Sequence, residues 1–246
     1  MLSEILILLP LFLAVAILYS SVGHGGATSY LAILVLAGFS REGIAPTVLV
    51  LNILVTLLGS INYYRAGHFD GQLLLPFILA SVPAAFIGGS LRLAEGIHST
   101  ITGLTLFAAG FRFLLFASPI SPRPVIARRL LYSVGLPVGF ALGFLAGLIG
   151  IGGGVFLSPL LLLMGWADAK KTAALSAAFI LLNSSSGLIA HILKGPPDWA
   201  LLASLGVTVC IGGWIGSHVG AFRLLPTTLL RILGVVLLMA ASKLLI

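Results

Sequence analysis

Charged residues are scarce in this chain of 246 residues, of which 8% are charged and 59% are hydrophobic. In an ordinary soluble domain about a quarter of the residues are charged. The mean hydropathy is +1.21, and apolar runs recur along the whole length. This composition excludes a water-soluble protein and predicts one that is embedded in a lipid bilayer.

The apolar runs contain no acidic residue, and the chain has a single cysteine and no recognisable enzyme motif. All six acidic residues fall at or beyond the ends of the runs, which excludes a carboxylate-lined cation path and the usual Asp/Glu proton relay. The lone cysteine, Cys210, excludes an internal disulfide and a cysteine metal cluster. The zinc-protease, hydrolase and phosphate-loop motifs are also lacking. We therefore expect no enzyme activity, no cofactor and no metal.

Basic residues exceed acidic ones, with 13 Lys and Arg against 6 Asp and Glu and a formal charge of +7. In a soluble chain such an excess would indicate a nucleic-acid partner. Here the basic residues lie in short connections between apolar runs, where Lys and Arg fix the orientation of a membrane protein. We expect no nucleic-acid partner.

Two of the apolar runs are too long for one straight crossing. The runs lie near 5–38, 44–64, 72–91, 98–117, 130–165, 172–193, 199–221 and 227–246. As single helices, 5–38 and 130–165 would each exceed about 50 Å, whereas the hydrocarbon core is about 30 Å thick. Each contains a glycine cluster, at 23–26 and at 150–154, where the helix is expected to break.

The two glycine clusters belong to an internal repeat. Adding 127 to the numbering of the first half places like residues on like, so that Gly23 falls on Gly150 and Gly38 on Gly165. We predict an all-α polytopic membrane protein of two homologous halves, with about 8–10 transmembrane segments and two glycine-broken helices. The predicted units are a first membrane repeat at 1–117, a cytoplasmic linker at 118–129 and a second membrane repeat at 130–246.

The relative orientation of the halves depends on whether each long run crosses once or turns back. One kinked crossing gives parallel repeats, and a hairpin or two crossings gives inverted ones. The parallel arrangement divides the basic residues almost evenly between the two sides. The inverted arrangement gives a stronger bias and is favoured, with the linker in the cytoplasm. The inverted arrangement places seven basic residues on the cytoplasmic side and four on the opposite side. The seven are Arg65, Arg123, Arg128, Arg129, Lys170, Lys171 and Arg223, and the four are Arg41, Arg92, Lys194 and Lys243.

The glycine breaks are the candidate binding sites. Non-helical backbone inside a bilayer is tolerated only where protein or a water-filled cavity receives its polar groups. A helix that resumes after each break would present unpaired N–H groups and the positive end of its dipole to an anion. His24 and Thr28 add side-chain donors, and His24 is the best-placed titrating group if protons are coupled. The alternative is that the glycines only let helices pack closely.

Buried amides and hydroxyls extend the candidate site. Asn52 and the stretch that begins at Asn183 lie inside apolar runs and need a polar partner or a cavity. For Asn183 a role in the path and an interhelical hydrogen bond remain open, whereas for Asn62 the hydrogen bond is favoured. The candidate binding residues are Gly23, His24, Gly25, Gly26, Thr28, Asn52, Gly150, Gly152, Gly153, Gly154, Asn183 and Ser184.

Two stretches resemble a known family. Residues 21–28, Ser-Val-Gly-His-Gly-Gly-Ala-Thr, and 147–160, Gly-Leu-Ile-Gly-Ile-Gly-Gly-Gly-Val-Phe-Leu-Ser-Pro-Leu, are similar to the TauE/SafE sulfite exporter family, also called the toluene sulfonate uptake permease family. The resemblance runs over essentially the whole chain. One departure is that Pro159 corresponds to Ala32 in the first half, so the halves need not contribute equally.

The resemblance implies a multi-pass protein of the inner cell membrane that transports small sulfur-containing anions such as sulfite or organosulfonates. Export is the direction of transport that we expect. The partners expected are the anion and the lipid bilayer. A homo-oligomer stays open, because lipid-facing and partner-facing apolar surfaces look alike. The alternative function is a membrane-embedded enzyme or a scaffold subunit without transport activity. A bound metal or a mid-membrane nucleophile would favour the enzyme, and unbroken long helices would favour the scaffold.

Overall fold

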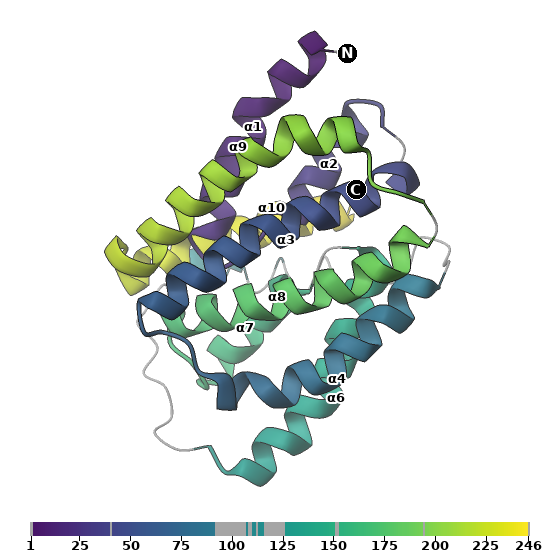
Figure 1. The fold of residues 1–246 in the computed structure, drawn as a ribbon. Coiled ribbons are helices and arrows are strands. Elements are labelled where there is room, and N and C mark those ends of the chain that lie inside the picture. The colour runs from purple at the N-terminus through teal and green to yellow at the C-terminus, as the bar shows by residue number, and fades with distance from the viewer. Residues whose placement is uncertain are drawn as a thin grey trace.

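The computed structural model describes residues 2–39, 41–91, 107, 110–111, 113–115, 126–150, 153–193 and 195–245, and the regular elements among them are helices joined by short turns (Figure 1). Most of the predicted run 98–117 and most of the linker lie outside these residues. The helices are α1 (Leu2–Ser20), α2 (Ala27–Leu36), α3 (Arg41–Arg65), α4 (Gly71–Ser90), α6 (Arg128–Ile149), α7 (Gly154–Leu163), α8 (Ala169–Ile192), α9 (Trp199–His218), the π-helix η1 (Val219–Arg223) and α10 (Pro226–Leu245).

Five helical stretches of the described chain are long and apolar enough to cross a membrane. They are Ile44–Arg65, Gly71–Ser90, Arg128–Ile149, Ala169–Ile192 and Trp199–Arg223. Two other helices, α2 and α7, have 10 residues each. At about 1.5 Å per residue each spans roughly 15 Å, half of the hydrocarbon core. These two short helices therefore begin or end inside the bilayer if the long ones span it.

Both short helices follow glycines with left-handed backbone. The chain leaves α1 at Ser20 and starts α2 at Ala27, with φ of 77° at Gly23 and 93° at Gly26. It leaves α6 at Ile149 and starts α7 at Gly154, with φ of 76° at Gly150 and 74° at Gly153. Only glycine adopts positive φ without strain, which is why the helix ends and restarts at these positions.

Helices α3 and α8 form the centre of the molecule and run antiparallel (Figure 1). Asn52 of α3 contacts Ser184 of α8, and further along α3 Gly59 lies beside Ala177, so residue numbers fall in α8 as they rise in α3. The pair is flanked on one side by α9, which also packs on α1, and on the other by α4, which also packs on α6. This arrangement places the middle of both central helices deep in the protein.

Glycines let the outer pairs of helices approach backbone to backbone. On α6, Gly139, Gly143 and Gly147 recur every four residues, and a Cβ at Gly143 would overlap the Ser81 carbonyl of α4. On α9, a Cβ at Gly212 would lie 2.7 Å from the Ala16 Cβ of α1. Lipid provides no hydrophobic drive between helices, so close contact through small residues supplies much of the packing energy.

Aspartates start three of the helices, as expected for acids at the ends of apolar runs. Asp70, Asp168 and Asp198 accept hydrogen bonds from the first amides of α4, α8 and α9. Asp70 also pairs with Lys171 at 3.2 Å, and Lys170 donates to the Ala221 carbonyl at 3.1 Å. The α3–α4 connection, the start of α8 and η1 therefore lie at the same end of the molecule.

Candidate functional site

The first break, residues 21–26, is buried between α3 and α8, and its shape depends on glycine. A Cβ on Gly23 would overlap the backbone of Ala173 in α8, and a Cβ on Gly25 would overlap the side-chain oxygen of Asn52 in α3. Gly23 also has positive φ. Close approach of backbone to its neighbours, rather than flexibility, explains the glycines here.

Asn52 of α3 forms hydrogen bonds with the first residue of α2, which follows the first break, and with α8, in the second half of the chain. Its Oδ1 accepts from the Ala27 amide at 3.2 Å, and its Nδ2 donates to the Ser184 hydroxyl at 2.8 Å. Asn52 and Ser184 are each at most 1% exposed. The structure thus brings together two predicted site residues from different halves, and Asn52 occupies one of the amides that we expected to be unpaired.

His24 reaches from the first break to the helix that follows the second. Its Nε2 lies 3.1 Å from the Gly154 carbonyl oxygen and 2.9 Å from the Ser158 hydroxyl. The Ser158 hydroxyl lies 2.7 Å from that of Ser176 in α8. Because a carbonyl can only accept, Nε2 carries a proton and donates it to Gly154 or Ser158. His24 therefore links α7 and α8 to the first break.

Several polar groups around the first break have no partner within the described chain. The amide of His24 donates to the Tyr19 carbonyl at 2.9 Å, and the Ser29 and Tyr30 amides donate to the Gly26 carbonyl. The next amides after His24, those of Gly25 and Gly26, make no hydrogen bond with any described group. The Nδ1 atom of His24 is likewise buried without a partner.

Thr28 and the neighbouring Ser29 turn toward α1 in this structure. Their hydroxyls donate to the Tyr19 hydroxyl at 3.4 and 2.8 Å. Thr28, which makes further contacts, is buried within the first turn of α2. The predicted donors of this turn therefore bind Tyr19, an aromatic residue at the end of α1.

Asn183 bonds within its own helix. Its Nδ2 donates to the Phe179 carbonyl at 2.8 Å, while Oδ1 is buried without a partner in the described chain. Of the two alternatives for Asn183, the structure does not show the interhelical hydrogen bond. For Asn62 that bond is confirmed, because its Nδ2 donates to the Ser217 hydroxyl of α9 at 2.8 Å.

The described residues of the second break are Gly150, Gly153 and the first residue of α7, Gly154. A Cβ at Gly153 would lie 2.7 Å from the Ala146 Cβ, and a Cβ at Gly154 would overlap the side chain of Ile180. A Cβ at Gly150 would lie 3.7 Å from His191 Nε2. Gly152 lies outside the described residues. Among the described residues, the first break takes part in side-chain hydrogen bonds between helices.

Sequence reasoning did not name all of the contact residues, and Ser176 and Tyr19 are two examples. Ser176 lies seven positions before Asn183, on the same face of α8, and that spacing could have pointed to it. Tyr19 ends α1 just before the break, where a hydroxyl can receive the polar residues that follow. In the described chain, no acidic, Lys or Arg side chain hydrogen-bonds at the first break. Backbone amides and neutral side chains make up this site.

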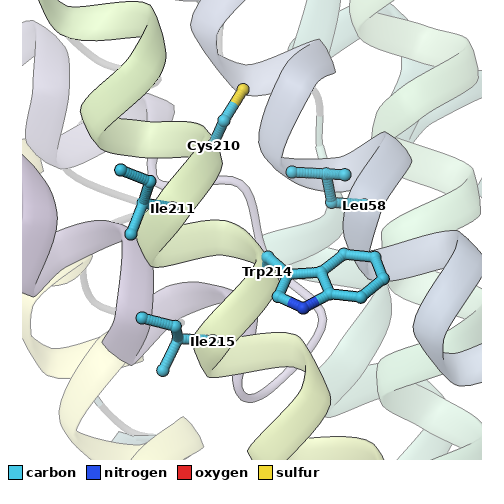
Figure 2. A pocket seen from close by; sticks show the side chains of 5 residues that line it. All are labelled: Leu58, Cys210, Ile211, Trp214 and Ile215. Atoms are coloured by element: carbon cyan, nitrogen blue, oxygen red, sulfur yellow. The ribbon is translucent and has the colours of Figure 1, made fainter.

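A surface hollow of about 370 Å³ lies elsewhere, on the outer side of α3 and α9 (Figure 2). It is lined by Leu58, Cys210, Ile211, Trp214 and Ile215. Trp214 and Leu58 face each other across it, and the Cys210 thiol points between the two helices (Figure 2). Its apolar lining suits lipid chains and offers no donor array for an anion.

Comparison with known proteins assigns the chain to a family. The sequence model of the family described as Sulfite exporter TauE/SafE matches residues 8–244. The "Probable membrane transporter protein y4hK" of Sinorhizobium fredii is 34% identical over 240 residues, 95% of either chain. The "Probable membrane transporter protein YdhB" of Bacillus subtilis is 27% identical over 244 residues, 92% of this chain and 93% of its own.

A shorter stretch is similar to a plant protein. The "Sulfite exporter TauE/SafE family protein 1" of Arabidopsis thaliana is 42% identical over 78 residues, 32% of this chain and 16% of its own. No solved structure matches. With a family match over nearly its whole length and several helices apolar enough to span a bilayer, the chain is a multi-pass membrane protein that belongs to the sulfite exporter TauE/SafE family of membrane transporters.

Proposed function

We propose that the protein carries a small sulfur-containing oxyanion, sulfite or an organosulfonate, across the membrane, with export as its direction. The anion is held at the first break, against the restart of α2. One observation carries this proposal. The backbone amides of Gly25 and Gly26, two successive buried residues, make no hydrogen bond with the described chain, and the Nδ1 atom of the preceding residue, His24, is also buried without a partner there.

The chemistry of these groups suits an oxyanion. Successive N–H groups at the start of a helix point toward one region and carry the positive end of the helix dipole. Gly25 and Gly26 have no side chains to keep a ligand from the backbone. An oxyanion of sulfur presents several acceptor oxygens, which can receive both amides at once, whereas a cation would find no carboxylate among the groups bonded there.

Inverted repeats would give the transporter its two access states. Helices α3 and α8 correspond under the 127-residue offset, and their antiparallel packing supports inverted halves, 1–117 and 130–246, joined by a cytoplasmic linker at 118–129. The contact between Lys171 and Asp70 also supports this arrangement, because parallel repeats would place those residues on opposite sides. Rocking of the halves about the first break would then expose the anion to each side in turn.

Counterflow in proteoliposomes tests the proposed function. Purified protein is reconstituted, the lumen is loaded with unlabelled sulfite, thiosulfate, sulfoacetate or a carboxylate, and uptake of radiolabelled sulfite is followed. We expect sulfur oxyanions to drive uptake and carboxylates to fail. Gly25→Ala is expected to lose uptake, because the new methyl overlaps Asn52 and alters the break.

The matched control is Gly195→Ala, where a Cβ meets nothing within 4 Å. Its uptake should equal that of the wild type. Equal uptake by Gly25→Ala, or no wild-type counterflow with any sulfur oxyanion in the panel, would refute the proposed function.

A further inference from the structure

The unpartnered nitrogen of His24 can take a proton. Nε2 already bears one, because it lies 3.1 Å from the Gly154 carbonyl oxygen, which only accepts. In the neutral ring Nδ1 is therefore an acceptor, and it is buried with no partner in the described chain. His24 is 1% exposed, so an imidazolium at this position needs a negative charge close by.

The bound anion is the charge that would meet this need. Gly25 and Gly26, whose amides would hold the anion, directly follow His24 in the chain. No carboxylate is among the groups that hydrogen-bond His24. An anion at the amides would favour protonation of His24, and a protonated His24 would favour the anion, because each compensates the other in a medium of low dielectric constant.

A line of hydroxyls leads from His24 toward one end of α8. The Nε2 atom lies 2.9 Å from Ser158 Oγ, which lies 2.7 Å from Ser176 Oγ. One helical turn before Ser176, Thr172 presents a buried hydroxyl that has no partner in the described chain. Lys171, the residue directly before Thr172, pairs with Asp70 at that end of the molecule.

We propose that His24 binds one proton together with the oxyanion, and that this proton exchanges with the α8 N-terminal end of the molecule through the hydroxyls of Ser158, Ser176 and Thr172. The inference rests on the proposed function and names its coupling ion. A proton added to the Nδ1 lone pair forms the imidazolium. On release, Nε2 gives its proton to Ser158 Oγ, the Ser158 hydroxyl proton passes to Ser176 Oγ and the Ser176 hydroxyl proton passes to Thr172 Oγ. The Thr172 hydroxyl proton then goes to solvent water at that end of the molecule, so every hydroxyl ends neutral and His24 keeps its proton on Nδ1. Nothing is oxidised, and the anion forms no covalent bond.

The other titratable groups near this line are few. The ring of Tyr19 in α1 lies 6.5 Å from that of His24 between centroids. Tyr63 of α3 hydrogen-bonds the backbone of the same break. From α7 the Ser158 hydroxyl faces His24, and from α8 the Ser176 hydroxyl faces Ser158. The titratable groups of α8 lie at its ends, with Asp168, Lys170 and Lys171 at the start and His191 in the last turn. An imidazole is the one group among these that ordinarily titrates near neutral pH.

The experiment measures proton and sulfite movement in the same proteoliposomes, made with the full-length protein and a pH-sensitive dye in the lumen. For the wild type, a sulfite gradient should produce a pH change in the lumen that bare liposomes lack. Thr172→Val keeps the shape of the side chain and removes the hydroxyl. It should lower net sulfite flux and the linked pH change by about tenfold or more. It should leave sulfite counterflow unchanged, because exchange requires no net release of the proton.

Two further variants sharpen the result. His24→Gln can still donate to the Gly154 carbonyl but cannot take up a proton, so the number of protons moved per sulfite should fall toward zero. Ser186→Ala is the matched control, since its buried hydroxyl also lies on α8 but donates to the Val82 carbonyl, away from the line. This variant should keep the wild-type flux and pH change.

The outcomes separate the inference from the proposed function. Sulfite counterflow by the wild type without any pH change during net flux would overturn the inference and leave the proposed function standing. The same conclusion follows if Thr172→Val moves protons and sulfite as Ser186→Ala does. If the wild type shows no sulfur-oxyanion counterflow at all, both are wrong.

Discussion

Replacing Gly25 by alanine tests the central packing of the site. The new Cβ would overlap Asn52 Oδ1 and would lie 2.6 Å from Asn52 Cγ and 2.9 Å from the methyl carbon of Thr56. The Asn52 amide has to move, and its hydrogen bonds with the Ala27 amide and the Ser184 hydroxyl are lost. The variant should therefore be less stable than the wild type.

The size of the effect follows from those two bonds. An average side-chain hydrogen bond in a membrane protein contributes about 0.6 kcal/mol. Leaving a buried donor or acceptor without a partner costs about 1–3 kcal/mol. Loss of both Asn52 bonds should thus lower the free energy of unfolding by about 2–4 kcal/mol, which corresponds to roughly 5–15 °C in the melting temperature for a chain of this length.

The assay is thermal unfolding of the purified protein in detergent, with Gly195→Ala as the control that should melt as the wild type does. A double-mutant cycle isolates the cause. Asn52→Ala removes the side chain that the new methyl strikes, so adding Gly25→Ala to it should lower stability by less than about 0.5 kcal/mol more. Full additivity of the two substitutions would refute the explanation based on the Asn52 overlap.

Other regions of the molecule give three more expectations. Gly143→Ala should separate α6 from α4 and lower the melting temperature by several degrees, because the new Cβ overlaps the Ser81 carbonyl of α4. Gly59→Ala is the control and should be neutral or slightly stabilising, because its Cβ would lie 3.6 Å from the nearest atom, the Ala177 Cβ. Equal melting temperatures of the two variants would contradict the role of close packing. Asp70→Asn keeps the helix cap and removes an ion pair whose side chains are each 34% exposed, so the free energy of unfolding should change by less than about 1 kcal/mol, measured through the melting temperature. A larger loss would show that the ion pair stabilises the fold. The orientation of the halves can be tested with single cysteines in a background without the native cysteine. Gly67→Cys should react with a membrane-impermeant thiol reagent only from the cytoplasmic side, and Gly195→Cys only from the opposite side. Labelling of both positions from the same side would exclude inverted repeats.

Local chemistry accounts for where several of the described helices start and end. Asp70, Asp168 and Asp198 offer caps to the first amides of their helices. Glycines at 23 and 150 allow the positive φ that ends a helix. Helix α6 begins at Arg128, two residues before the predicted start of the apolar run 130–165.

The side-chain contacts of the site were harder to foresee. Asn52 was named as a candidate because it lies inside an apolar run, and His24 because it lies beside the first glycine break, but the partners of these two residues were not predicted. Thr28 was expected to serve a ligand, and in the structure its hydroxyl donates to Tyr19. The role of Asn183 was open, and its intrahelical bond with Phe179 was not among the alternatives. Each partner depends on which helices are neighbours.

Composition and local backbone chemistry determined that this chain lies in a bilayer, keeps its acids outside the apolar runs and carries two glycine clusters at which a helix can end. Tertiary structure alone decided that His24 would meet Gly154, 130 residues away, and that Asn52 would meet Ser184. The physical reason is that helices in lipid are apolar on every face, so no hydrophobic period marks the side that packs against protein. The pairing of helices is set by where glycines permit close contact and where buried polar groups find one another.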